Sequence, residues 1–496
     1  MKIYIFYLYS IILIGLVLRF YNLVAVSLWH DEAFSALLIK YPWGEMMHRI
    51  AADVHPPFYY IILRFWNYIF GSSLFSLRFF SLFFGMLTVW ILYVFIKKAF
   101  NSERLALIAS LLVAINPFQI QFSQEARMYT LGAFLVILSS WLLLKAFEKK
   151  TYISWAIYGV VAGLALLTHY FLMFSVAAQG AFVLIWLFKK DWRQMYLIEA
   201  IKKMIVGFGV SVLVFLPYLP TFIRQFSQVQ DSYWIPKMTP VSIPATLWKM
   251  ISGWGYLVGS NFLWGFALVF VILFSIVLFK KSIGGQSKWF VIVSFVVPFL
   301  LAIALSFKRS LYLDRYFIFA GIFYIVIWAM LLDILIIKWK KIAYVLLIGM
   351  IISSGFFYLN NWAKTRVSDR PGMAGASLYI NNNYESGQKI LIGSTFVYFT
   401  FEYYNETGIR PLLISPGTYD INQMFHFSGN ALLNNSDLVP KLQNKVSAGD
   451  SVWVLWTTGF GAVKPTVPEN WQQTDEQWFD DVRDRGWIVI TLYQIN

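Results

Sequence analysis

The segment WHDEAFS carries two adjacent acidic residues, Asp31 and Glu32. Neighbouring carboxylates repel each other, and a nearby bilayer makes both costly to keep ionised. The stretch before them, from Ile3 to Tyr21, is almost wholly apolar and long enough to cross a membrane. In such a pair, one carboxylate can act as a general base or bind a metal ion while its neighbour stays hydrogen-bonded.

Other titratable side chains gather in one set of connecting segments, 22–78, 116–128, 168–170, 217–260 and 306–316. Seven of the 12 carboxylates before residue 360 lie there, namely Asp31, Glu32, Glu45, Asp53, Glu125, Asp231 and Asp314. The histidines of this region lie there too, at His30, His48, His55 and His169. This distribution is typical of a polar site, although acidic residues also avoid the basic cytoplasmic loops of membrane proteins for topological reasons.

The elements that must position these residues are membrane helices. Of the 496 residues, 59% are hydrophobic and 13% are charged, against about 25% charged in globular proteins. Residues 1–359 hold 30 Lys and Arg against 12 Asp and Glu, whereas residues 360–496 hold 10 against 13. A basic membrane part suits topology and anionic lipids and argues against nucleic-acid binding. The chain has no cysteine, which excludes disulfides and thiolate chemistry.

Apolar stretches of roughly twenty residues predict about eleven transmembrane helices. They lie near residues 3–21, 74–96, 105–121, 128–147, 152–168, 170–188, 203–219, 261–279, 289–306, 316–337 and 342–359. No cleavage site of small residues follows the first stretch, so we interpret it as a retained helix. The segment HPPFYYIILRFWNYIFG, residues 55–71, is apolar but short, begins with two prolines and contains Arg64. We place it in the membrane interface, together with the amphipathic stretch WGEMMHRIAADV before it.

The distribution of basic residues predicts the orientation. With residues 55–71 lying flat, one set of short loops holds 17 Lys and Arg, and the longer opposite set holds 11. The positive-inside rule makes the first set cytoplasmic. We therefore expect a multi-pass protein of the plasma (inner) membrane, with a cytoplasmic N-terminus and a transmembrane domain over residues 1–359 whose first outer loop is 22–73.

The composition changes at residue 360, where charged residues, Asn and Gly become frequent. The runs KILIGSTFVYF and SVWVLWTT predict strands, and the stretches GMAGASLYINNN and TDEQWFDDVRDRG predict helices. Residues 360–496 are long enough for a core of their own. We predict a small α/β domain on the extracytoplasmic side.

The chain resembles the membrane glycosyltransferases of the protein O-mannosyltransferase-like family, within the GT-C superfamily. The resemblance rests on the order of five segments, WHDEAFS, DVHPPFYYIILRFWNYIFGSSLFSLRFFS, NPFQIQFSQEARMYTLGAFLV, LTHYF and DRYFIFA. It covers most of residues 15–190, with weaker matches at 312–320 and in the tail. No single motif is decisive, but the ordered set is specific.

The resemblance implies a transferase that moves one sugar, mannose or another hexose or pentose, from a polyprenyl or dolichyl phosphate carrier to an acceptor outside the cytoplasm. In that family the acidic pair of the first outer loop is the catalytic landmark, which corresponds to Asp31 and Glu32. Such a donor carries its own leaving group, so the enzyme needs a base for the acceptor hydroxyl and cations for the departing phosphate. We expect Asp31 to be the base of an inverting displacement, and Glu32 to orient the acceptor or support Asp31.

The cations expected to hold the phosphate lie in KRSLYLDRYF, at Lys308, Arg309 and Arg315, beside Tyr316. Arginine offers a planar fork that matches phosphate oxygens, although such residues also serve as interfacial anchors. The pair Arg315-Tyr316 resembles the Arg-Tyr element that the family places before a late span. Arg127 in SQEARMY is also expected to bind the phosphate of the donor. Further site candidates are Glu125 in the same segment, His55 and Tyr59 around the two prolines, and His169. SQEARMY has no DxD motif, which leaves the need for a divalent cation open.

Two other classes of protein remain compatible with many spans and interfacial charge. A transporter or flippase of lipid-linked saccharides usually has broken helices in matching halves and polar groups at mid-membrane, whereas these spans are nearly free of ionisable residues. A non-catalytic scaffold whose tail binds a partner is the second alternative. The acceptor class, whether protein, lipid or glycan, is not determined by the sequence.

Overall fold

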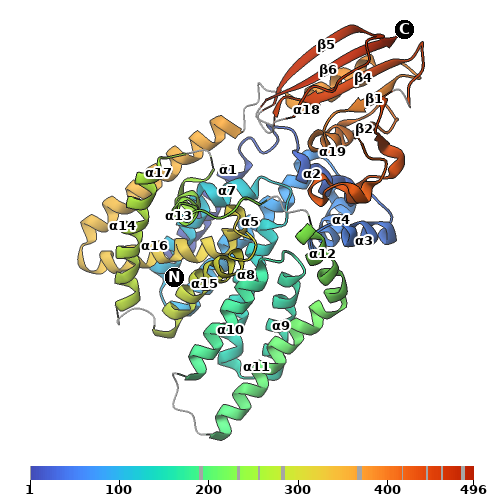
Figure 1. Ribbon diagram of the computed structural model, residues 1–496. Helices are drawn as coiled ribbons and strands as arrows, with labels where there is room; N and C mark the ends of the chain where they lie inside the picture. The colour runs from blue at the N-terminus through green and yellow to red at the C-terminus, as the bar shows by residue number, and fades with distance from the viewer. Residues whose placement is uncertain are drawn as a thin grey trace.

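The computed structural model describes residues 2–188, 194–231, 235–254, 257–280, 285–365, 371–415, 417–442, 445–459, 462–481 and 486–496. A bundle of long helices carries a small mixed sheet at one end (Figure 1). Within these residues, eight helices are long and apolar enough to cross a membrane, or nine if one bent pair of helices counts as a single span. Two shorter apolar helices are also present, and with them the total equals the number of about eleven that the sequence predicts.

The membrane segments share a dominance of Leu, Ile, Val and Phe and differ in how much they bury. In chain order they are α1 (Lys2–Phe20), α5 (Leu74–Phe100), the pair α6 (Glu103–Ile115) and α7 (Pro117–Ser123), α8 (Tyr129–Lys149), α9 (Tyr152–Leu166), α10 (Leu172–Phe188), α11 (Gln194–Phe215), α14 (Ser260–Phe279), α15 (Gly285–Ser306), α16 (Ile318–Lys338) and α17 (Lys340–Thr365). Helices α5, α8 and α16 are mostly buried by their neighbours, whereas α14 and α17 are mostly exposed, as is expected of helices that face lipid.

The third crossing is broken by 60° between α6 and α7. Pro117 begins α7 and has no N–H to continue the helix, and the Asn116 side chain caps the new start by accepting from the Gln119 N–H at 2.9 Å. The break exposes carbonyls of α6, and Arg19 of α1 donates to one of them, the carbonyl of Ala114, at 2.6 Å. The freed backbone groups are thereby satisfied inside the membrane part, as a break at this depth requires.

Three short helices form the first outer loop, α2 (His30–Leu38), α3 (Trp43–Ala52) and α4 (Phe58–Phe70). None is long enough to cross a bilayer. Along α4, Tyr59, Tyr60 and Leu63 are buried against the bundle, while Tyr68 and Ile69 are exposed. This amphipathic pattern suits a helix that lies in the interface, and α4 is not among the candidate spans of the described residues, in agreement with the prediction for residues 55–71.

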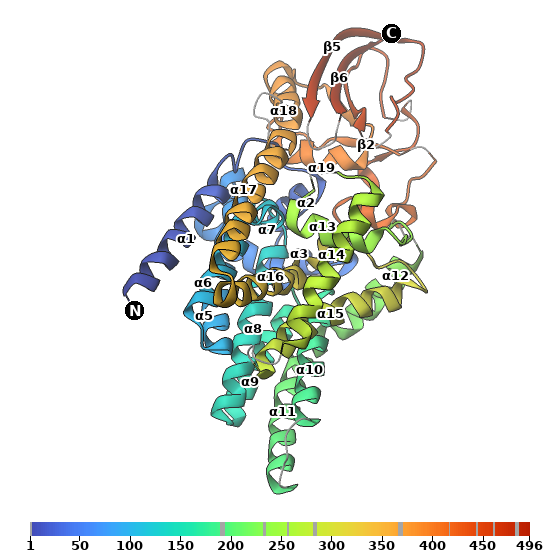
Figure 2. The ribbon, with the colours of Figure 1, turned by 90° about the vertical axis from the view of Figure 1, so that its left-hand side faces the viewer.

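The two sets of loops lie at opposite ends of the bundle. At one end Lys98 pairs with Glu148 and Arg104 with Asp333, each at 2.6 Å, which brings together the loops predicted to be cytoplasmic. At the other end Tyr218 donates to the carbonyl of His55 at 3.3 Å, which joins the first outer loop to the short helices η1 (Leu216–Tyr218) and α12 (Leu219–Asp231). The tail caps this second end (Figure 2). The absolute orientation stays a prediction.

The tail forms a six-stranded sheet in the order β3-β2-β1-β4-β6-β5. The strands are β1 (Lys389–Ile392), β2 (Leu412–Ile414), β3 (Leu438–Val439), β4 (Ser451–Thr457), β5 (Trp471–Asp481) and β6 (Gly486–Ile495). Strands β1 to β4 run parallel to one another, and β6 pairs antiparallel with both β4 and β5. Two helices, α18 (Gly372–Asn383) and α19 (Thr395–Tyr404), accompany the sheet. The expected small α/β region is present.

Two local predictions in the tail are wrong or partly wrong. The stretch TDEQWFDDVRDRG, predicted as a helix, lies largely in strand β5 because Asp475 to Asp481 pair with β6, and this tertiary pairing overrides the helical propensity of its charged residues. Its residues 482–485 lie outside the described part of the chain. In KILIGSTFVYF only the first four residues form a strand, because Ser394 caps the start of α19.

The tail packs directly on the first outer loop. The His30 ring lies against Phe396 and Phe399 of α19, and His30 Nδ1 is 3.1 Å from the carbonyl oxygen of Thr395. The backbone N–H of Leu28 donates to the Tyr404 hydroxyl at 3.0 Å. Helix α2 therefore packs against α19 of the tail (Figure 1).

Candidate active site

The acidic pair occupies the first turn of α2, where the exposed N–H groups and the helix dipole favour negative charge. The Glu32 carboxylate accepts a hydrogen bond from the backbone N–H of Trp29, the residue that caps the helix, at 3.3 Å. Asp31 and Glu32 are neighbours along a helix, so their side chains point in different directions. The two carboxylates consequently have different surroundings.

Glu32 is fully buried and paired with a charge that is also fully buried. Its oxygens accept from Arg78 Nε at 2.9 Å and Nη2 at 2.8 Å, and from the backbone N–H of Ala126 at 2.8 Å. Arg78 also donates to the carbonyl oxygens of Leu23 and Val26. These hydrogen bonds connect α2 to α5, to the segment before α2 that holds Leu23 and Val26, and to the loop that holds Ala126.

Asp31 remains partly accessible, with 29% of its side chain exposed. Its Oδ2 lies 3.9 Å from Arg127 Nη2 and 3.7 Å from Arg315 Nη1. Burial alone would raise the pKa of Asp31, but these two guanidinium groups outweigh it and hold the pKa below its ordinary value. Asp31 is therefore ionised at neutral pH, and both ion pairs are longer than a hydrogen bond.

Arg127 is nearly inaccessible and holds this part of the site together. Its Nη1 donates to the Asp31 carbonyl at 3.1 Å and to Ser35 Oγ at 3.0 Å, and its Nη2 lies 3.2 Å from His55 Nε2. Burial by itself would lower the pKa of Arg127, but Asp31 and nearby tyrosines raise it, so the guanidinium stays charged. Because a guanidinium can only donate, His55 Nε2 must accept.

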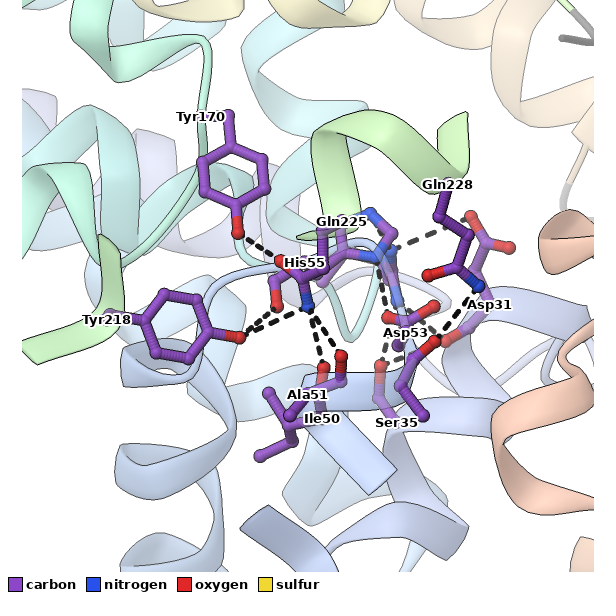
Figure 3. Close-up of polar contacts among 12 residues, drawn as sticks. Asp31, Ser35, Ile50, Ala51, Asp53, His55, Tyr170, Tyr218, Gln225 and Gln228 are labelled. Atoms are coloured by element: carbon purple, nitrogen blue, oxygen red, sulfur yellow. Dashed lines mark hydrogen bonds and ion pairs between the residues drawn. The ribbon is translucent and has the colours of Figure 1, made fainter. Parts of the chain in front are cut away.

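His55 in turn is oriented by Asp53, whose Oδ2 lies 2.8 Å from His55 Nδ1. With Nε2 accepting, Nδ1 carries the proton and donates to Asp53. Figure 3 draws Asp31, Ser35, Asp53 and His55 within one network of polar contacts. The carbonyls of Ile50 and Ala51, just before Asp53, accept from the Gln225 side chain of α12, which fixes the loop that carries the pair.

Arg315 reaches Asp31 from the opposite side of the site. It lies in a short 3-10 helix, η2 (Asp314–Phe317), immediately before α16, and its side chain is 15% exposed. Its guanidinium carbon lies 5.7 Å from the ring centre of Trp29 and 5.6 Å from that of Trp254. Two aromatic faces thus hold the guanidinium while its Nη1 faces Asp31.

The other sequence candidates divide between the wall of the site and its surroundings. Tyr316 packs on His169 with ring centres 5.1 Å apart, and His169 Nδ1 accepts from the backbone N–H of Phe171 at 3.1 Å. Burial, together with the positive charges of Arg127 and Arg315, lowers the pKa of His169 well below its ordinary value, so the ring is neutral. Burial likewise raises the pKa of Tyr59, which packs against Tyr60.

Glu125 is buried and close enough to both Arg78 and Arg315 to interact with their charges. Lys308 and Arg309 are exposed in the connection between α15 and α16, and within the described residues the ion pairs of Asp31 do not include them. The structure therefore brings Arg127 and Arg315 to Asp31 but leaves the other two cations apart. No group of three or more His, Asp or Glu residues in the described ranges is arranged to hold a metal ion.

Sequence reasoning assigned no role to several residues of this site. Arg78 is a cation at the outer end of a span, and a charge in such a place usually has a buried partner. Asp53 stands two residues before His55, a spacing that the loop conformation converts into a hydrogen bond. Ser35 is one turn after Asp31 on α2, where residues four apart share a face. Trp254 lies far along the chain and carries no comparable signal.

Comparison with known proteins relates the chain to one family and one fold. Residues 54–220 match the family model described as dolichyl-phosphate-mannose-protein mannosyltransferase. The matched range includes His55, Tyr59, Glu125, Arg127 and His169. The family resemblance drawn from the sequence is confirmed. No curated protein matches the chain by sequence.

The fold is shared with solved structures of low sequence identity. ArnT from Cupriavidus metallidurans bound to undecaprenyl phosphate is 14% identical with a TM-score of 0.59, and its apo state is 13% identical with a TM-score of 0.61. In both comparisons 97% of each chain is covered. The Archaeoglobus fulgidus oligosaccharyltransferase AglB, in complex with an inhibitory peptide and a dolichol phosphate, is 13% identical with a TM-score of 0.52, covering 82% of this chain and 64% of that one. The expected GT-C-like fold is confirmed.

Proposed function

We propose that this protein is a membrane glycosyltransferase that transfers one sugar from a polyprenyl phosphate carrier to an acceptor hydroxyl on the extracytoplasmic side. The observation that carries the proposal is the Asp31 carboxylate, partly accessible and held between the guanidinium groups of Arg127 and Arg315 at 3.9 and 3.7 Å. Transfer from a sugar phosphate requires a base that takes the proton of the acceptor hydroxyl and cations that stabilise the departing phosphate.

The proposed reaction is a single displacement. The acceptor hydroxyl gives its proton to Asp31 while its oxygen forms a bond to C1 of the sugar. The bond between C1 and the phosphate oxygen breaks, polyprenyl phosphate leaves, and the configuration at C1 inverts. The negative phosphate offsets the cations that lower the pKa of Asp31, so donor binding makes Asp31 a stronger base at the moment the acceptor needs one.

The roles of the two arginines follow from their exposure. Arg127 is 3% exposed, and its hydrogen bonds go to Asp31, Ser35 and His55, so we assign it to positioning the base. Arg315 is 15% exposed and stands between two tryptophan rings, so we assign it to the phosphate. The contacts with both rings restrict the guanidinium, whose planar fork can make two parallel hydrogen bonds to phosphate oxygens.

The comparisons support the same substrate class. The matching family model describes transferases that use a dolichyl phosphate sugar. The ArnT structure of the same fold is bound to undecaprenyl phosphate, and the AglB structure holds a dolichol phosphate. A polyprenyl phosphate carrying mannose or another hexose or pentose is accordingly the donor that we propose.

The first prediction concerns the phosphate. Replacing Arg315 with Lys is expected to weaken binding of sugar-free polyprenyl phosphate roughly tenfold or more, because Lys keeps the charge but cannot make two parallel hydrogen bonds. The measurement is competition by undecaprenyl phosphate against the sugar donor, with the protein in nanodiscs. Arg309→Lys is the matched control, since Arg309 is an exposed arginine of the same connection. Identical inhibition curves for wild type and Arg315→Lys would reduce Arg315 to an interfacial anchor.

The second prediction concerns orientation. A reporter fused after Lys149, in the basic loop between α8 and α9, is expected to lie in the cytoplasm, because this end of the bundle carries the basic loops. A reporter fused after Trp362 is expected to lie outside, on the side of Asp31. Alkaline phosphatase and fluorescent-protein fusions in intact cells measure both positions. The two reporters falling on the same side of the membrane would contradict the proposed topology.

A further inference from the structure

A cavity of about 190 Å³ lies between the C-terminal end of α2 and the tail. The first outer loop contributes one wall, with Lys40 and Tyr41 next to Leu37. The tail contributes the other wall, with Tyr398, Phe399, Glu402 and Arg410 next to Leu432. The cavity is distinct from the cluster around Asp31, and none of its lining residues has a role in the proposed transfer.

The cavity combines an aromatic floor with charged groups at its rim. Tyr398 and Phe399 are buried side chains of α19, and the Tyr398 hydroxyl donates to the carbonyl of Pro411 at 2.8 Å, so the floor is rigid. Lys40 and Arg410 are exposed at the rim. Aromatic faces bind the apolar faces of a ligand, while a few polar groups fix its orientation, which is the usual composition of a small-molecule site.

The charges around the cavity favour a neutral ligand that bears hydroxyl groups. Arg410 is engaged, because its Nη2 lies 2.8 Å from Asp437 Oδ2 and donates to the carbonyl of Leu432 at 2.9 Å. Glu402 accepts from Asn405 Nδ2 at 3.3 Å, and burial raises its pKa above the ordinary value. The Glu402 carboxylate would repel an anionic ligand, and Lys40 and Arg410 would repel a cationic ligand. Hydroxyl groups of a neutral ligand can donate to Glu402 and accept from Lys40.

The cavity is rigidly connected to the proposed base. Leu37 follows Asp31 by six residues on the same helix, an axial rise of about 9 Å. Phe399 packs on Phe34, and the His30 ring packs on Phe399, so the helix that carries the base packs directly on the helix that forms the floor. A ligand held in the cavity is therefore at a fixed distance from Asp31.

We propose that this cavity, between α2 and α19, binds a neutral sugar unit of a saccharide acceptor and that Glu402 and Lys40 hold its hydroxyl groups. The proposal rests on the transferase function proposed above and extends it to the acceptor. It gives the tail a role as half of the acceptor site. A protein or a lipid without sugar would not use these polar groups in the same way.

Direct binding tests the cavity without requiring catalysis. The full chain in nanodiscs is mixed with a panel of methyl glycosides of mannose, galactose and N-acetylglucosamine, and saturation-transfer NMR measures binding. Wild-type protein is expected to bind at least one glycoside. Glu402→Ala is expected to weaken that binding about tenfold or more, because hydrogen bonds to a carboxylate are lost. Glu406→Ala, an exposed position shortly after α19, is expected to bind as wild type.

A second variant protects the test against misfolding. Lys40→Ala removes an exposed rim cation, leaves the aromatic floor intact, and is expected to weaken the same glycoside in the same direction. Binding of undecaprenyl phosphate, measured in the same samples, should be unchanged in both variants. Failure of wild type to bind any glycoside of the panel, or equal binding by wild type and both variants, would overturn the acceptor site.

The outcomes also separate this proposal from the proposed function. If wild-type protein binds a glycoside but does not bind undecaprenyl phosphate, the proposed transferase function is contradicted and the proposed saccharide site is not. Normal phosphate binding without glycoside binding would contradict the cavity alone. A peptide that binds wild type and is weakened by Glu402→Ala would assign the cavity to a protein acceptor and overturn the saccharide proposal.

Discussion

Replacing Asp31 with Asn is expected to lower the rate of sugar transfer by about 10²- to 10⁴-fold, which is the usual cost of losing a general base. Asn has nearly the same volume as Asp and can still face Arg127 and Arg315, so the fold should be preserved. It cannot take the proton of the acceptor hydroxyl. The loss should therefore appear in kcat, with the affinity for polyprenyl phosphate retained or increased, since a negative charge has been removed beside the phosphate.

The measurement is single-turnover transfer by purified protein, with donor binding followed in parallel. The control is Glu45→Gln on α3, which removes an exposed carboxylate that pairs with Arg49 on the same helix. A pair of this kind contributes little to stability. Near-normal turnover by Asp31→Asn would mean that another group accepts the proton.

The second large effect is expected from Glu32→Gln, and it should appear in stability. Arg78 and Glu32 are both fully buried, and removing the charge of Glu32 leaves the Arg78 guanidinium without its carboxylate inside the protein. Breaking a buried pair in this way typically costs about 3–5 kcal/mol. Unfolding of the purified protein in detergent, followed by heat or denaturant, should show a clear loss for Glu32→Gln and little change for Asp31→Asn.

A double variant separates the charge effect from the loss of shape. Replacing both Glu32 and Arg78 with Met removes the two charges together, and such apolar replacements of buried pairs are often neutral or stabilising. The double variant also removes the hydrogen bonds of Arg78 to the carbonyls of Leu23 and Val26. A recovery of stability relative to Glu32→Gln would therefore show that the unpaired Arg78 charge costs more than these lost hydrogen bonds. A stable Glu32→Gln protein with a specific defect in acceptor affinity would instead favour the role first expected for Glu32, in orienting the acceptor.

The membrane part of the fold could be predicted from the sequence because its physical cause is local. A helix that crosses a bilayer needs about twenty apolar residues, so each span can be recognised from its own stretch of sequence. The loops rich in Lys and Arg indicate which end of the bundle faces the cytoplasm. The same holds for α4, where two prolines and Arg64 within a short apolar stretch predicted an interfacial helix. The tail was less predictable, since β5 exists only because it pairs with β6.

The site shows the same division. Residue types and order were enough to select Asp31, Arg127, Arg315 and His55 as candidates. Ionisable side chains at a membrane are costly to desolvate, so their presence there indicates a functional or structural role. The sequence could not assign different surroundings to Asp31 and Glu32, which are adjacent and chemically alike. Neighbouring residues on a helix point about 100° apart, and only the packing of α2 against α5 and α19 turns Glu32 toward Arg78 and leaves Asp31 between two arginines from distant segments. Contacts between segments far apart in the chain depend on how the helices pack, and that information is held by the tertiary structure.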